Sequence, residues 1–162
     1  AIYSRFEDGE AAMKCLDNIA KSALTNNLFT FHNDWRKMNI SLNTDCPIQL
    51  DAVMGYVNAV QEMLLYVSED LVKVLPALPE RLVKGEVNSL RYVNGYINMS
   101  WNKEQKEIHI TFNAIRKHIM YIQLPDFIEE YSFIGENCTV EKEDGFYKVS
   151  MEQGASLIIK RI

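Results

Sequence analysis

Apolar residues recur at helical spacing in the first part of the chain. Across residues 7–25 they fall on one side of a 3.6-residue repeat, and acidic side chains occupy the first turn, where the helix dipole stabilises negative charge. Residues 52–68 form a second pattern that is apolar nearly all round, which is typical of a helix buried among other helices. Two helices cannot cover such a surface, so we expect helical partners from a missing part of the chain or from another chain.

Residues 28–47, between these two patterns, have no periodicity and are rich in polar residues. A stretch of this length is more often a functional loop than an idle one. It carries His32 and Trp35. Flat aromatic rings suit the C–H faces of sugars, and they would equally well anchor the loop to a core.

The character of the chain changes after Leu75, because Pro76 and Pro79 exclude a helix there. Short alternating runs separated by turn residues follow, which is the pattern of antiparallel strands. Asn94 with Gly95, and Asp144 with Gly145, predict type I′ hairpins. The spacing of the runs predicts a β-sandwich. The predicted strands are residues 87–93, 96–101, 107–112, 118–124, 131–134, 139–142, 146–151 and 156–162.

The patterns together predict an α+β protein with two domains. Residues 1–75 form the helical domain and residues 76–162 form the antiparallel β-sandwich. The composition agrees with a globular chain, since 48% of the 162 residues are hydrophobic and 24% are charged.

Charge and hydropathy exclude two classes of partner. Twenty-two acidic residues outnumber 17 basic ones, which gives a net charge of −5. Nucleic acids and anionic membrane surfaces both need a basic face, so we expect neither as a partner. No apolar run approaches the roughly 20 residues of a membrane span.

Cysteine and histidine suggest no metal centre and no disulfide framework. Cys15, Cys46 and Cys138 are an odd number without C-x-x-C spacing, so we expect buried apolar thiols. The three histidines share no ligand spacing with cysteine or aspartate, and His109 and His118 fall in predicted strands. The sequence has no glycine-rich phosphate loop and no G-x-S-x-G motif, so we expect no cofactor.

Asp51 stands where the polar loop meets the second helical pattern. Its position fits a helix N-cap. It also fits an active-site carboxylate held at a helix start, with Gln49 and His32 nearby. Such a carboxylate stays ionised, so it would orient or deprotonate a partner but would be a poor general acid. Glu62, within the second helical pattern, is expected to be a paired core carboxylate.

A succession of short motifs resembles glycoside hydrolase family 95, the α-L-fucosidases and their relatives. The family patterns ARL-x-DG-x-A, NLF, PFQIDAN, EMLL, LPALP and G-x-V-x-GL-x-(A)RGG…W all have counterparts in the same order. Each match is weak by itself, but the succession is specific. The matching stretches are RFEDGEAA (5–12), NLF (27–29), HNDWR (32–36), PIQLDA (47–52), EMLL (62–65), LPALP (75–79), GEV (85–87), LR (90–91) and Trp101.

The resemblance implies a fold and a mechanism. Residues 1–75 would be the last helices of an (α/α)6 barrel, and residues 76–162 the C-terminal β-sandwich of the parent protein. Such enzymes cleave terminal α-L-fucosyl or related L-sugar linkages with inversion. Asp51 would polarise asparagine amides that act as the base, and an upstream glutamate would be the acid. We expect His32, Trp35 and Gln49 to bind the sugar of an oligosaccharide or glycan substrate.

The acid and the base would belong to the missing upstream barrel, so we expect no fucosidase activity from this chain alone. The start of the chain has neither an initiator methionine nor a leader-like segment, in line with a piece of a longer protein. The richness in Lys, Asn and Ile is typical of an AT-rich bacterial genome, and the parent would be secreted or cytoplasmic.

Two alternatives stay open. Val53 stands where the family has asparagine, either as a neutral repacking or as the mark of a shifted substrate. The chain would instead be a non-catalytic carbohydrate-binding or structural β module if Tyr92, Tyr96 and Trp101 formed an exposed aromatic platform, although strand aromatics are more often core residues.

Overall fold

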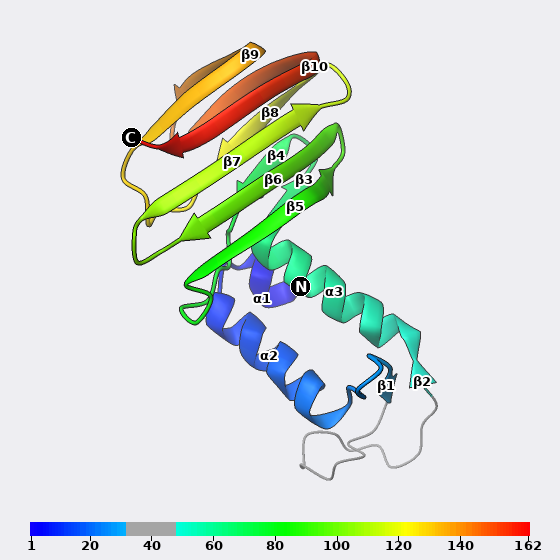
Figure 1. Ribbon diagram of the computed structural model, residues 1–162. Helices are drawn as coiled ribbons and strands as arrows, with labels where there is room; N and C mark the ends of the chain where they lie inside the picture. The colour runs from blue at the N-terminus through cyan, green and yellow to red at the C-terminus, as the bar shows by residue number, and fades with distance from the viewer. Residues whose placement is uncertain (32–47) are drawn as a thin grey trace. The chain divides into compact units, whose positions relative to one another are not determined.

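The computed structural model describes residues 1–31 and 48–162, which divide into two compact units (Figure 1). The helical unit comprises Ala1–Leu64 and Pro76–Pro79. The sheet unit comprises Leu65–Leu75 and Glu80–Ile162. The first part of the helical unit therefore ends at Leu64, eleven residues before the predicted boundary at residue 75. The unit also includes Pro76–Pro79, which lie after that boundary.

The described residues of the helical unit form three helices and one short strand pair: α1 (Ile2–Arg5), α2 (Gly9–Ser22), α3 (Leu50–Leu64), β1 (Thr30–Phe31) and β2 (Ile48–Gln49). The Asp8 carboxylate caps α2 by accepting a hydrogen bond from the Ala11 N–H at 2.9 Å. Small and flexible apolar side chains of α2, α3 and the 76–79 segment form the core of this unit, namely Ala12, Leu16, Ala59, Met63 and Ala77.

Both predicted helices exist, but α3 is shorter than expected. The apolar pattern predicted a helix to residue 68, whereas α3 ends at Leu64 and the chain continues as β3 (Leu65–Ser68). Glu69, with a φ of 54°, turns the chain so that β3 pairs with β4 (Leu71–Val74). The aromatic and β-branched residues in this stretch favour the strand once a partner strand is available.

The sheet unit is one eight-stranded, mostly antiparallel sheet in the order β3-β4-β8-β10-β7-β6-β5, with β9 pairing to β10. Only the β4–β8 pair among these strands is parallel. In Figure 1, β3, β4 and β8 lie behind β5, β6 and β7. The remaining bounds are β5 (Lys84–Tyr92), β6 (Gly95–Asn102), β7 (Glu107–Ala114), β8 (His118–Gln123), β9 (Tyr131–Glu143) and β10 (Phe146–Arg161).

The long strand β10 joins the two parts of the sheet. Its first half pairs with β8 and its second half with β7, while β9 follows it along most of its length. The register shifts between Met151 and Ser156, where Gly154 has a φ of 79°. The last four predicted runs therefore form two bent strands, because bulges interrupt the pattern without ending the pairing. This α+β fold, with its nearly closed sheet, is consistent with the predicted sandwich.

Of the two predicted hairpin turns, one is correct. Asp144 and Gly145 have φ values of 37° and 87°, as a type I′ turn requires. The other hairpin exists, but its loop is Val93 and Asn94, and Gly95 already pairs with Tyr92. A Cβ at Gly95 would clash with the Asn113 carbonyl oxygen, so this glycine permits a close approach between strands rather than a left-handed turn.

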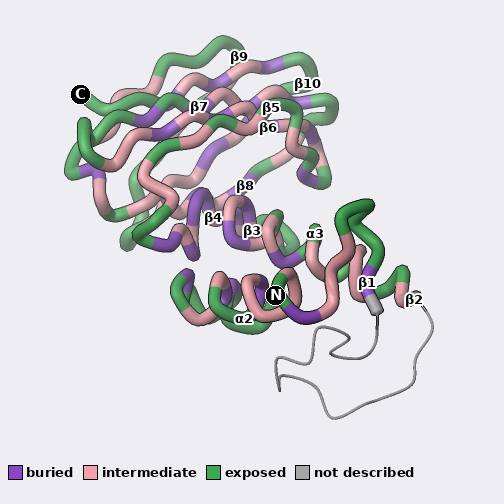
Figure 2. The backbone as a smooth tube through the Cα atoms, turned by 60° about the horizontal axis from the view of Figure 1, so that its bottom comes forward, coloured by how far each residue is buried: buried purple, intermediate pink, exposed green. Residues whose placement is uncertain are grey.

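The core of the sheet unit lies on one face of the alternating strands. Buried and partly exposed residues alternate along the whole of β6 and most of β7, and Figure 2 shows this alternation along the tube. The outward face is predominantly polar. The fully buried side chains include Ile97, Ile110, Phe112, Met120, Ile122, Leu157 and Ile159.

Candidate functional site

Asp51 lies in the first turn of α3, where its negative charge suits the helix dipole. The helix begins at Leu50, so Asp51 is a first-turn residue and the prediction of an N-cap is wrong. Its side chain is exposed. The residues that the structure describes therefore leave this carboxylate accessible, and its role in a catalytic site stays a prediction.

Gln49 ends β2, directly before α3, and is half-buried. It pairs with Thr30 of β1, and the Thr30 hydroxyl donates a hydrogen bond to the Gln49 carbonyl oxygen at 2.5 Å. This pairing joins the described residues directly before and after residues 32–47, namely Thr30–Phe31 and Ile48–Gln49. The two other predicted sugar-binding residues, His32 and Trp35, lie outside the described residues.

α3 presents two apolar faces. One packs against the helical core through Ala59 and Met63, with Tyr56 and Val60 beside them. The other contains Leu50, Met54 and Val57, which are 61%, 69% and 59% exposed. These three residues follow the i, i+4, i+7 spacing of one helix face and flank Asp51. We call them the open face of α3.

Val53, at the position of the family asparagine, is half-buried on α3. A half-buried valine needs no hydrogen-bond partner, whereas an asparagine in the same place would need one if it were covered. Nothing in the described structure distinguishes a neutral repacking from a shifted substrate.

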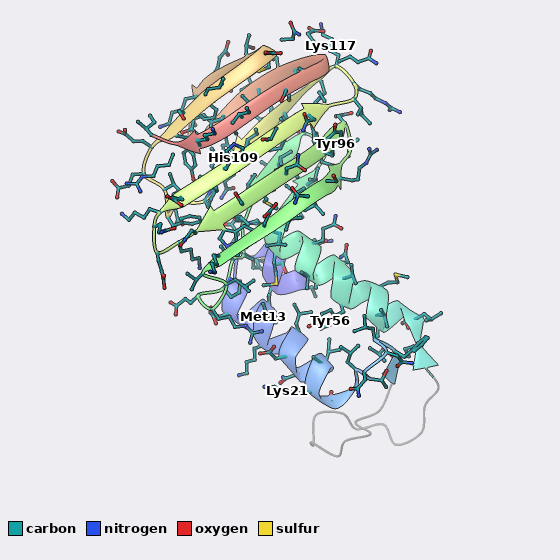
Figure 3. The ribbon with its side chains drawn as sticks, in the orientation of Figure 1. Met13, Lys21, Tyr56, Tyr96, His109 and Lys117 are labelled. Atoms are coloured by element: carbon teal, nitrogen blue, oxygen red, sulfur yellow. The ribbon has the colours of Figure 1, made fainter. Side chains whose placement is uncertain are left out.

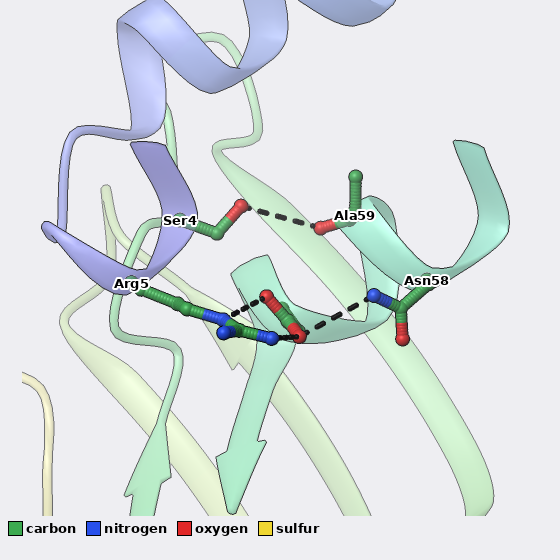
Figure 4. A network of polar contacts seen from close by, with 5 residues as sticks. Ser4, Arg5, Asn58 and Ala59 are labelled. Carbon is green, nitrogen blue, oxygen red and sulfur yellow. Dashed lines mark hydrogen bonds and ion pairs between the residues drawn. The ribbon is translucent and has the colours of Figure 1, made fainter. Parts of the chain in front are cut away.

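Glu62 is paired, as the sequence predicted, but it is half-buried and not a core residue. The Arg5 guanidinium donates two hydrogen bonds to it, at 3.0 and 2.8 Å, and Asn58 Nδ2 donates a third at 3.3 Å (Figure 4). The hydrogen bonds from Arg5 lower the pKa of Glu62 below its ordinary value, although partial burial opposes the shift. An ionised, paired carboxylate cannot serve as a general acid near neutral pH. Its contact ties α1 to α3.

The stretches that carry the family resemblance contact one another within each unit. Arg5 and Glu62 come from two of these stretches. Gly9, in the same stretch as Arg5, approaches Ala77 of a third stretch, because a Cβ on Gly9 would lie 2.5 Å from the Ala77 carbonyl oxygen. In the sheet unit, Gly85 pairs with Trp101, whose ring occupies the space that a Cβ on Gly85 would need.

Tyr92, Tyr96 and Trp101 do not form the exposed platform that a carbohydrate-binding module would offer. Tyr92 and Trp101 are both only 6% exposed. Burial raises the pKa of Tyr92 to about 12, and its hydroxyl lies 3.3 Å from His118 Nε2. The Trp101 indole N–H donates to the Leu82 carbonyl oxygen at 3.1 Å. Only Tyr96 of the three is half-buried on the outer face.

The cysteine prediction is partly wrong. Cys15 is exposed on α2, and Cys138 is half-buried, with burial raising the pKa of its thiol. Both thiols are free, and Cys46 lies outside the described residues. Cys15 falls on the polar side of α2 because the core-facing positions on this helix are Ala12 and Leu16.

No group of three or more metal-ligating side chains occurs among the described residues. No helix in that part of the chain is long and apolar enough to cross a membrane. Sequence reasoning missed the polar outer face of the sheet, where Ser100 on β6 pairs with His109 on β7. The strand register alone brings these two residues together, so no local motif marks them.

A scan against models of known protein families gives no match for this chain, and a search of curated proteins gives none either.

Proposed function

We propose that this chain is the C-terminal part of an inverting glycoside hydrolase similar to family 95, acting on terminal α-L-fucosyl or related L-sugar linkages. In this proposal, α2 and α3 are the last helices of an (α/α)6 barrel, and upstream helices of the parent protein cover the open face of α3. The observation that carries the proposal is the position of Asp51 beside this open face.

The open face favours a helical partner. Leu50, Met54 and Val57 are each more than half exposed, and they are contiguous on one side of α3. Clustered exposed apolar side chains of this kind usually mark an interaction surface. A helix packed there would bury them and would place its own side chains next to Asp51.

The chemistry of Asp51 fits the role that the resemblance implies. An inverting glycosidase needs an acid on the leaving oxygen and a base for the attacking water. An amide is a feeble base unless an ionised carboxylate accepts a hydrogen bond from its N–H. Asp51 is an exposed carboxylate in the first turn of α3, so its oxygens are accessible to accept a hydrogen bond from such an amide.

The contacts between the family-like stretches support the same proposal. Arg5 with Glu62, Gly9 with Ala77, and Gly85 with Trp101 each join residues that are distant in sequence. These contacts explain in structural terms why the stretches that match the family patterns occur in the same chain. The alternative of a carbohydrate-binding module with an aromatic platform is less well supported, because Tyr92 and Trp101 face the core.

The test uses the full-length parent protein with 2′-fucosyllactose and an aryl α-L-fucoside as substrates. We expect Asp51→Asn to lower kcat by about 10²- to 10⁴-fold, the usual contribution of general base catalysis. Glu10→Gln is the matched control, since it removes an exposed first-turn carboxylate from α2 and should leave kcat unchanged. The proposal is wrong if the parent protein hydrolyses neither substrate, or if Asp51→Asn retains full activity.

A further inference from the structure

The outer face of the sheet unit carries a row of polar side chains across neighbouring strands. Glu86 pairs with Ser100, Ser100 with His109, and His109 with Lys160. Because paired residues point to the same side of a sheet, these four side chains form one row across β5, β6, β7 and β10. Figure 3 labels His109 on β7 and Tyr96 on β6.

Two hollows adjoin this row, and both are lined by Ser100 and His109. The first has a volume of about 490 Å³ and lies toward the strand ends, where Asn102, Glu107, Lys160 and Arg161 line it. The second has a volume of about 480 Å³ and lies over β5, β6 and β7. Its other polar lining residues are Glu86, Asn88, Ser89, Asn98 and Thr111.

A β-bulge shapes the second hollow. The register of β5 shifts between Val87 and Leu90, and Ser89 has a φ of 59°, a left-handed conformation that costs free energy in a residue other than glycine. The Asn98 side-chain oxygen accepts a hydrogen bond from the Ser89 N–H at 2.8 Å. Bulges of this kind redirect side chains next to binding sites, and here Asn88 and Ser89 line the hollow.

Hydrogen bonds fix several of these groups before any ligand arrives. The Asn98 amide is oriented by the Ser89 N–H, so its own N–H groups are not used in that bond. Asn88 Nδ2 donates to Glu86 Oε1 at 2.7 Å. Polar groups that are already held in place lose little conformational entropy on binding, which favours affinity for a small polar ligand.

The charges around the two hollows balance. Among the side chains of the lining residues, Glu86 and Glu107 carry two negative charges and Lys160 and Arg161 carry two positive ones. The Arg161 guanidinium also donates to the carbonyl oxygens of Gln105 and Lys106 at 3.1 and 3.2 Å. Partial burial lowers the pKa of His109 most, and the positive charge of Lys160 lowers it further. The imidazole of His109 is therefore neutral at neutral pH. The remaining polar lining consists of hydroxyl and amide groups, which both donate and accept hydrogen bonds.

We propose that the two hollows form one binding site for a neutral oligosaccharide. Sugar hydroxyls donate and accept hydrogen bonds and carry no charge, which matches a charge-balanced lining of serine, threonine and asparagine. Asn98 and Asn102 lie roughly 13 Å apart along β6, from the rise of a strand per residue, so the site spans more than one sugar ring. The site lies wholly within the sheet unit and does not depend on the proposed hydrolase activity.

The test is an NMR titration of the full ¹⁵N-labelled chain with 2′-fucosyllactose, lacto-N-tetraose, cellotetraose and xylotetraose. We expect at least one of these sugars to give saturable shifts at the amides of residues 98–102 and 109–111. Ser100→Ala and Thr111→Val should each weaken that binding about 3- to 10-fold, as expected for the loss of one neutral hydrogen bond.

Ser132→Ala is the matched control. Ser132 pairs with Lys160 in the same cross-strand row but lines neither hollow, so its substitution should leave the dissociation constant unchanged. Trigalacturonic acid and a neutral glycine–serine peptide serve as competing probes. The proposal is overturned if no neutral sugar binds, if either competing probe binds more tightly, or if Ser100→Ala and Ser132→Ala have equal effects.

Discussion

At the scale of single residues, two helical glycines occupy opposite environments. Gly9 begins α2 against the backbone of the 76–79 segment, where a Cβ would lie 2.5 Å from the Ala77 carbonyl oxygen and 2.9 Å from the Pro79 nitrogen. Gly55 lies within α3, and no atom of the described residues lies within 4 Å of the corresponding position. Glycine is therefore needed for close packing at position 9, whereas the described packing does not require it at position 55.

This contrast predicts opposite signs for the same substitution. Gly9→Ala should lower the free energy of unfolding by about 1–3 kcal/mol, because backbone atoms must move to admit the methyl group. Gly55→Ala should raise it by about 0.5–1 kcal/mol, because alanine is the better helix former. Urea denaturation followed by circular dichroism at the helix minimum measures both. Equal effects of the two substitutions would contradict the packing described for Gly9.

The ion pair between Arg5 and Glu62 gives the helical unit a pH-dependent contribution to stability. Hydrogen bonds from Arg5 hold the pKa of Glu62 below the ordinary value of 4.5 in the folded state. The contribution is therefore fully present above that value, and it is lost as the pH falls through the folded-state pKa. Because the Arg5 side chain is 57% exposed, solvent screening keeps the effect small.

We expect Glu62→Gln to lower the free energy of unfolding by about 1 kcal/mol at pH 7, because the ion pair and its hydrogen bonds are weakened. The difference from the wild type should shrink as the pH is lowered below 4.5. Denaturant titrations at several pH values measure this. Glu129→Gln is the control, since the Glu129–Lys106 pair is exposed on both sides. A difference that persists unchanged at acidic pH would argue against the ion pair as its source.

At the scale of elements, α3 has one face that the described residues cover and one that they leave open. Val57 lies on the open face, and Met63, 1% exposed, lies in the helical core. Polar substitution on a surface that the chain itself does not cover should cost little, whereas truncation in a packed core removes contacts and leaves a cavity.

Val57→Gln should therefore change the free energy of unfolding of this chain by less than about 0.5 kcal/mol. Met63→Ala should lower it by about 2–5 kcal/mol. Thermal and urea denaturation of the two variants provide the comparison. In the full-length parent protein, Val57→Gln should become strongly destabilising if upstream helices cover the open face. If Val57→Gln changes the free energy of unfolding equally little in both proteins, upstream helices do not cover the open face.

The differences between the predicted and observed elements have a common physical cause. Alternation within a strand is a local signal, so β5 to β8 and the turn at Asp144 and Gly145 could be predicted. Pairing between distant strands is not a local signal. The apolar residues of β3 continue the pattern of α3 and so predict the end of a helix, whereas pairing with β4 makes this segment a strand.

The candidate sites follow the same division. The sequence predicted that Glu62 is paired, because a carboxylate in an apolar helix needs a partner, but it did not identify Arg5, 57 residues earlier in the chain. The polar hollows around Ser100 and His109 depend on cross-strand register and on the bulge at Ser89, neither of which appears as a motif. The sequence indicates Asp51 by its position at the start of a helix, and in the structure Asp51 is the second residue of α3.

At the scale of the whole molecule, the two units are interleaved along the chain. Leu65–Leu75 belongs to the sheet unit, and Pro76–Pro79 belongs to the helical unit, where Ala77 is 1% exposed and its N–H donates to the Met63 carbonyl oxygen at 3.3 Å. The boundary at residue 75 that the prolines suggested would separate β3 and β4 from β8. A domain that begins at residue 76 would lack β4, so the parallel β4–β8 pair could not form and one edge of β8 would be unpaired.

Two fragments of the chain distinguish these boundaries. Residues 65–162 keep every strand of the sheet unit, so this fragment should be monomeric, give a dispersed NMR spectrum and unfold cooperatively. Residues 76–162 lack β3 and β4, which removes the packing of Val72 and Val74, each 1% exposed, and uncovers an unpaired strand edge. Exposed edges of this kind promote association. We therefore expect the shorter fragment to unfold at lower urea concentration and to aggregate in size-exclusion chromatography. Equal stability of the two fragments would show that β3 and β4 contribute little to the sheet and that the boundary lies at the prolines after all.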